Sequence, residues 1–92
     1  MTLRWSVRAQ ADLLALTDYY RAIEPDLSIR MRSRVEQTPA LLASFPRLGT
    51  QLGNSNVRKL RVRQTPYLLF YRIAGDDIFV LRVLHAARDI PS

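Results

Sequence analysis

The chain of 92 residues is long enough for one domain and leaves little room for a second, and its hydrophobic share of 48% argues against disorder. It has no cysteine, which excludes disulfides and thiolate metal sites. Fourteen Lys and Arg against eight Asp and Glu give a net charge of +6, and arginine supplies all but one of the cations. Because arginine presents a planar fork of donors to carboxylates and phosphates, this balance predicts an acidic partner, either a protein or a nucleic acid. The alternative is a basic surface that is only solvated.

The sequence gives no sign of an export or membrane segment. Charged residues interrupt the apolar positions near its start, unlike a signal peptide. No stretch approaches the roughly 18–20 apolar residues that span a bilayer. Together with the lack of cysteine, this leads us to expect a cytoplasmic protein without membrane contact.

A strand and a helix are predicted first. Residues 3–7 alternate apolar and polar side chains, which is typical of a half-buried strand. Residues 9–23 contain no Gly or Pro and repeat apolar positions at helical spacing. Asp12 lies early in this segment, where a carboxylate favours the N-terminus of a helix.

A second helix follows the break at Pro25, since a residue before proline avoids the α region. Its apolar positions recur at helical spacing as far as Phe45, and Asp26 is the expected N-cap. Pro39 lies inside this segment and should kink or split the helix. A helical hairpin is the expected result.

The second half of the chain predicts strands. Residues 46–56 are rich in Pro, Gly, Asn and Ser and indicate a loop. Strands are expected over 57–64, 66–74 and 77–85, followed by a polar tail over 86–92. The order β-α-α-β-β-β predicts a single α+β domain over residues 1–92, with an antiparallel-rich sheet and a two-helix hairpin on one of its faces.

Alternation along each strand predicts which side chains face the helices. That side receives Leu60, Val62, Leu69, Tyr71, Ile73, Phe79, Leu81 and Val83, and the opposite side receives Lys59, Ile78 and most of the candidate residues below. The opposite side mixes cations with large apolar residues, whereas a solvated face would alternate cleanly to polar, so we expect a binding site there. The candidate binding residues are Arg61, Arg63, Leu68, Phe70, Arg72, Val80, Arg82, Leu84 and, in the tail, Arg88. Alternatively, the tail or a loop covers this side, or the register slips at a bulge.

Catalytic chemistry has weak support in the sequence. His85 is the only histidine, and alternation sends it toward the helices, opposite Arg82, where a hydrogen-bonded structural role is the simpler interpretation. Asp76 and Asp77 fall in a hairpin turn and are typical of turn polarity. Neither a Gly-x-Ser-x-Gly elbow nor a phosphate-cradling loop is present. We therefore assign no catalytic residue, metal ligand or cofactor.

The C-terminal third resembles the end of ParE toxins. The resemblance lies in a tyrosine-bearing strand, a short acidic turn and a final strand and tail, which here read Pro66-Tyr67-Leu68-Leu69-Phe70-Tyr71-Arg72-Ile73, Asp77-Ile78 and Val80-Leu81-Arg82-Val83-Leu84-His85-Ala86-Ala87-Arg88-Asp89. Upstream, the Trp5 strand, Ala11-Asp12-Leu13, and Phe45-Pro46 followed by Gly49 are also similar to that family. The resemblance implies the RelE/ParE toxin fold.

It also implies the toxin of a type II toxin–antitoxin system, of the kind tied to plasmid maintenance and stress response. Such a toxin would inhibit DNA gyrase by binding it, without an active site of its own. A ParD-like antitoxin would neutralise it by laying an acidic, amphipathic C-terminal segment over the mixed face and the helices. Operator DNA would be reached only through the antitoxin, and a toxin dimer or a toxin–antitoxin heterotetramer is expected.

Two alternatives remain open. Relatives of the RelE type cleave mRNA on the ribosome and tend to carry an arginine three residues before the tyrosine of the third strand, where this chain has Leu68. Metal-free RNA cleavage needs a base, a cation on the phosphate and an acid, and His85, Arg82 and Arg88 could supply two of those roles. The other alternative is a degraded toxin that survives only as a DNA-bound repressor partner.

Overall fold

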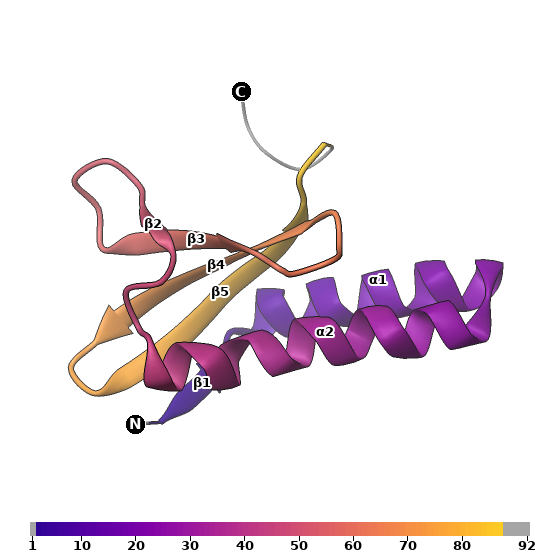
Figure 1. Cartoon of the computed structure of the whole chain (residues 1–92), viewed down its shortest axis with the longest axis horizontal. Coiled ribbons are helices and arrows are strands. Elements are labelled where there is room, and N and C mark those ends of the chain that lie inside the picture. Colours follow the sequence, from indigo (N-terminus) through magenta and orange to yellow (C-terminus); the bar gives the residue numbers. More distant parts are fainter. Residues whose placement is uncertain (1, 88–92) are drawn as a thin grey trace.

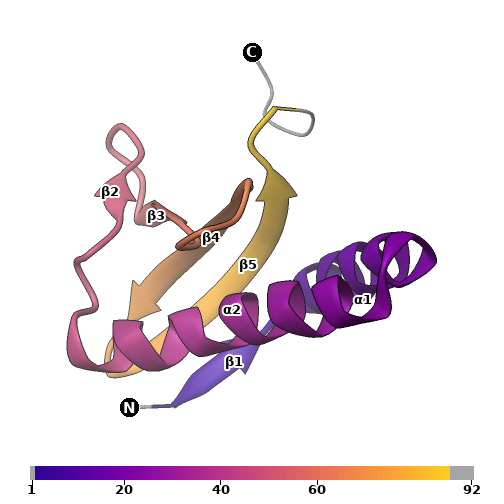
Figure 2. The same ribbon diagram turned by 45° about the vertical axis from the view of Figure 1, so that its right-hand side comes forward.

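The computed structural model describes residues 2–87 and arranges them in two layers (Figure 1). One layer is a hairpin of two helices, α1 (Val7–Ile23) and α2 (Pro25–Ser44). The other is a five-stranded sheet with the order β1-β5-β4-β3-β2, built from β1 (Leu3–Trp5), β2 (Thr50–Gln51), β3 (Val57–Arg61), β4 (Tyr67–Ala74) and β5 (Asp77–His85). Both helices lie on the same side of the sheet (Figures 1 and 2), so the predicted α+β class with a helical hairpin on one face is confirmed.

Both helices begin differently from the prediction. α1 starts inside the segment expected to be strand, because the Ser6 side chain caps it by accepting a hydrogen bond from the Ala9 N–H at 3.0 Å. α2 starts at Pro25 after Glu24, which makes no side-chain cap hydrogen bond, so the predicted Asp26 cap is wrong. The fixed φ of proline and its missing N–H suit the first helical turn, which explains this start.

α2 runs unbroken past Pro39, so of the predicted kink or split the split is wrong. The proline ring is fully buried, and so are the flanking side chains of Val35 and Leu42. Both halves of the helix therefore pack on the same core, and this packing holds the helix together across the hydrogen bond that proline cannot make. Neither α1 nor α2 combines the length and hydrophobicity needed to cross a membrane.

The sheet is antiparallel except at one edge, where β1 runs parallel to β5. β2 lies inside the segment predicted as a loop and pairs with β3. The sequence missed it because two residues are too few to show a period. β3 ends at Arg61, earlier than predicted, and a turn containing Gln64 at a φ of 61° leads into β4.

A β-bulge reverses the side of the sheet on which the first part of β5 was predicted to place its side chains. Phe70 of β4 pairs with Arg82, but the next residue, Tyr71, pairs with Val80, which leaves Leu81 without a partner on β4. Before the bulge the alternation is therefore inverted. Val80 is fully buried against the helices together with Ile78, although both were predicted on the opposite side. Phe79 and Leu81 were predicted toward the helices and are only half-buried, whereas Val83, beyond the bulge, is buried as predicted.

Candidate partner-binding surface

The side of the sheet that lacks helices carries three cross-strand rows, and each row mixes cations with apolar side chains. The rows are Arg61–Leu68–Leu84, Lys59–Phe70–Arg82 and Val57–Arg72–Phe79–Arg4. We call this surface, without the edge residue Arg82, the cationic sheet face. Along each strand, the side chains of this face alternate with core side chains such as those of Leu69 and Tyr71, which are fully buried on the helix side. The mixture of cations and apolar side chains that the sequence predicted is thus present on this side. In β5, however, Phe79 lies on it, and not Val80 as predicted.

The apolar side chains of this face are half-buried, whereas Arg4, Lys59 and Arg61 are exposed. The guanidinium of Arg72 lies over the ring of Phe79, 4.8 Å from its centroid, which is a cation–π contact. Within residues 2–87, the exposed cations have no ion-pair partner. The face therefore offers partly covered apolar area for contact and positive charges that the described chain leaves unneutralised.

Arg82 is held at the edge of the sheet by α1. Its Nε and Nη2 donate to the Asp12 carboxylate at 2.7 and 3.0 Å, and the Val83 N–H donates to the same carboxylate at 2.9 Å. The carboxylate can reach this edge because β1 covers only the first part of β5, up to Val80. Asp12 thus fastens α1 to β5, a role different from the helix-terminal one expected from the sequence. Arg82 therefore connects α1 to the sheet through its ion pair with Asp12.

His85 lies on the helix side, as predicted. Its ring packs edge-on against Tyr67 with the centroids 5.4 Å apart, and its Nδ1 accepts a hydrogen bond from the Ala87 N–H at 3.1 Å. His85 and Tyr67 line a hollow of about 230 Å³ between α1 and the sheet, together with Asp12 and Tyr19. The sheet therefore separates the imidazole from the cations of the cationic sheet face. Among residues 2–87, no group of three or more His, Cys, Asp or Glu could hold a metal ion.

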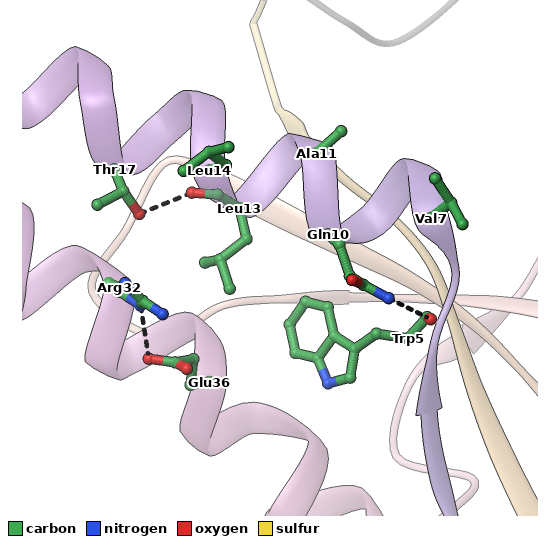
Figure 3. A pocket seen from close by; sticks show the side chains of 9 residues that line it. All are labelled: Trp5, Val7, Gln10, Ala11, Leu13, Leu14, Thr17, Arg32 and Glu36. Carbon is green, nitrogen blue, oxygen red and sulfur yellow. Dashed lines mark hydrogen bonds and ion pairs between the residues drawn. The ribbon is translucent and has the colours of Figure 1, made fainter.

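A larger hollow, of about 780 Å³, opens between α1, α2 and β1 (Figure 3). Trp5 and Leu13 project into it, and Val7 and Leu14 line it while remaining 82% and 60% exposed. Arg32 and Glu36 line it from α2 and form an ion pair, with the Arg32 Nε 3.1 Å from the Glu36 carboxylate. The sequence missed this hollow because Val7 was assigned to a strand. The signal was the spacing of seven between Val7 and Leu14, which puts them on one helical face.

Residues 3–90 match a protein family described as the ParE toxin of the type II toxin–antitoxin system parDE. The chain belongs to the ParE toxin family. It is 36% identical over 84 residues to the toxin RelE2 of Caulobacter vibrioides, covering 91% of this chain and 93% of that protein. It also resembles a solved chromosomal ParDE system from P. aeruginosa, with a TM-score of 0.78, 25% identity, and coverage of 92% of this chain and 95% of the other. The isolated RelE toxin of E. coli shares the fold, with a TM-score of 0.70, 20% identity and coverage of 96% and 86%.

Two segments of this chain that resemble ParE toxins lie side by side in the fold. Ala11-Asp12-Leu13 on α1 and Leu81-Arg82-Val83 on β5 are far apart in the chain, and the contact of Asp12 with Arg82 and Val83 joins them. Conversely, the candidate residues from the sequence do not all share one surface. Arg61, Leu68, Phe70, Arg72 and Leu84 lie on the cationic sheet face, whereas Val80 is buried and Arg82 is at the edge.

Two further candidates lie elsewhere or cannot be placed. Arg63 follows β3 and lines a hollow together with residues of α2, including Arg34 and Thr38, so it does not extend the cationic sheet face as predicted. The Gln64 carbonyl beside it accepts a hydrogen bond from Arg34 Nη1 at 3.3 Å. Arg88 lies outside the described residues.

Proposed function

We propose that this ParE-family toxin acts by binding, inhibits DNA gyrase, and is neutralised by a ParD-like antitoxin that covers the cationic sheet face. The observation that carries the proposal is the chequered arrangement of cations and half-buried apolar side chains on the side of the sheet without helices. The gyrase target rests on the resemblance of the C-terminal third to ParE toxins. The toxin works in the cytoplasm and joins the antitoxin in a heterotetramer that reaches operator DNA through the antitoxin.

The proposed antitoxin segment follows from the chemistry of this face. Phe70, Phe79 and Leu68 provide the apolar area that gives affinity when a partner covers them. Arg4, Lys59, Arg61 and Arg72 surround this area, so a segment with carboxylates between its apolar residues is attracted and oriented. An acidic amphipathic segment fits these requirements better than a neutral one.

The placement of His85 supports binding over catalysis. Cleavage of RNA without a metal requires a base and an acid beside the cations that hold the phosphate. Here His85, the candidate base, packs against Tyr67 on the helix side, and the guanidinium of Arg82, the candidate cation, is engaged by the Asp12 carboxylate. RNA cleavage of the RelE type is the second candidate, because a relative at 36% identity carries the RelE name.

Two assays on the purified toxin separate these functions. In a supercoiling assay with gyrase, we expect inhibition, and in a ribosome translation assay followed by primer extension we expect intact mRNA. Codon-linked cuts in the mRNA together with normal supercoiling would refute the gyrase proposal and favour the ribonuclease.

A further inference from the structure

The turn that follows α2 exposes apolar side chains on a part of the molecule away from the cationic sheet face. Phe45 and Leu48 are 60% and 48% exposed. They line a hollow of about 530 Å³ whose other walls include Ile73, near the end of β4, and Gly75 in the β4–β5 turn. Ile73 belongs to the helix side of the sheet, and Figure 1 shows this turn beside the β4–β5 hairpin. We call Phe45, Arg47, Leu48 and the hollow the turn patch.

Hydrogen bonds from the side chains of Tyr71 and Arg58 fix the backbone of this turn. The hydroxyl of the fully buried Tyr71 donates to the Pro46 carbonyl at 2.7 Å and accepts from the Gly49 N–H at 2.9 Å. Arg58 Nη1 donates to the Gly49 carbonyl at 2.7 Å and lies 3.4 Å from the Arg47 carbonyl. A Cβ at Gly49 would lie 2.8 Å from the Tyr71 ring and from a backbone oxygen, so the close approach requires glycine.

The turn after α2 holds the large apolar side chains of Phe45 and Leu48 outward on a backbone fixed by hydrogen bonds. Burying a phenylalanine side chain stabilises a domain by roughly 1.5–3 kcal/mol, and most of that gain is forgone at Phe45. Fixing such residues before a partner arrives removes the ordering cost of binding, which is how compact contact sites gain affinity. The turn patch therefore has the properties of a preorganised contact site.

We propose that the turn patch is where the toxin docks on the protein that it inhibits, an inference that rests on the proposed binding-type function. The patch is apolar, and Arg47 is the cation that lines its hollow. Arg47 has no ion-pair partner within residues 2–87. A nucleic acid would need a track of cations for its phosphates, so this surface fits a protein that presents an apolar anchor beside a carboxylate. The acidic antitoxin has its better match on the cationic sheet face, and the two surfaces can therefore be altered separately.

The test compares Phe45→Ser with Ile29→Ser. Ile29 is 67% exposed on α2 and lines none of the hollows described above, so it controls for the loss of an exposed apolar side chain. Each variant is expressed from a regulated promoter to measure growth arrest, and purified toxin is tested for gyrase inhibition and, by calorimetry, for antitoxin affinity. We expect Phe45→Ser to lose at least about tenfold in inhibition and to keep the antitoxin affinity within about threefold, while Ile29→Ser inhibits as the wild type does.

Arg47→Glu is the second variant, because its exposed side chain can be reversed in charge without disturbing the core. It should also weaken inhibition and spare antitoxin binding. Full inhibition by both turn-patch variants, or a parallel loss of antitoxin affinity, would overturn the docking site. If the wild type arrests growth without inhibiting gyrase and Phe45→Ser does not arrest growth, the gyrase assignment fails and the docking site stands. A wild type that neither arrests growth nor inhibits gyrase would overturn both.

Discussion

Replacing Tyr71 by phenylalanine removes one hydroxyl and leaves the ring in place. That hydroxyl makes two hydrogen bonds, to the Pro46 carbonyl and from the Gly49 N–H. Because the ring still fills its site, no cavity term enters the free energy of unfolding. The variant therefore isolates the contribution of the hydrogen bonds that anchor the turn after α2.

The expected loss in the free energy of unfolding depends on how well the Pro46 carbonyl and the Gly49 N–H are hydrated once the hydroxyl is gone. Leaving a buried donor or acceptor unpaired costs about 1–3 kcal/mol. Gly49 is buried, so its N–H should bear this cost in full, whereas Pro46 is half-buried and water can reach its carbonyl in part. We expect Tyr71→Phe to lower the free energy of unfolding by about 2–3 kcal/mol. For a domain of this size that is a large share of the total stability.

Urea unfolding followed by circular dichroism measures this difference. With a slope of about 1–1.5 kcal/mol per M, the midpoint should fall by about 2 M while the slope stays unchanged. The matched control is Tyr20→Phe, since Tyr20 is half-buried and its hydroxyl makes no hydrogen bond within residues 2–87. It should cost less than about 0.5 kcal/mol. A shift for Tyr71→Phe no larger than that of the control would refute the anchoring role of the hydroxyl.

Three other substitutions test the fold and the surface. Gly49→Ala forces a Cβ against a backbone oxygen, and we expect a loss of about 1–3 kcal/mol, seen as a lower Tm; an unchanged Tm would contradict the close approach. Asp12→Asn weakens the tie between α1 and β5 and should cost about 1–2 kcal/mol in urea unfolding, whereas Asp18→Asn, in an exposed ion pair, should cost almost nothing. Arg61→Glu should weaken antitoxin binding about tenfold at low salt, with the difference shrinking as salt rises, and Arg47→Glu in the turn after α2 should not. Unchanged affinity of Arg61→Glu at low salt would remove the cationic sheet face from the proposal.

The face of each strand was predictable only where the strand pairs without interruption. For β3 and β4 the alternation of Leu60, Leu69 and Tyr71 gave the correct side, because a period of two follows from the pleat alone. In β5 the same rule failed before Leu81. The bulge there adds one residue opposite β4, and no local property of the β5 sequence marks it. Val80 was misassigned for this reason.

Contacts between distant segments were equally out of reach. Asp12 has the sequence position of a carboxylate near the start of a helix. Only the placement of α1 at the uncovered edge of β5 gives Asp12 its partner, Arg82. The turn that carries Phe45 is likewise held by the hydroxyl of Tyr71, which donates to the carbonyl of Pro46, a residue 25 positions earlier in the chain. The local sequence pattern indicates neither contact, because each forms only when two distant elements pack together.

The sequence by itself determined the order of the elements other than β2, the two-helix hairpin, the α+β class and the mixed character of one sheet face. These properties follow from periodicity and composition, which each segment carries independently of the others. Only the tertiary structure decided which residues of β5 occupy that face, that Arg82 is tied to Asp12, and that the turn after α2 presents apolar side chains on a hydrogen-bonded backbone. Register, edge coverage and long-range hydrogen bonds depend on where segments meet in space, and that is fixed by packing of the whole chain.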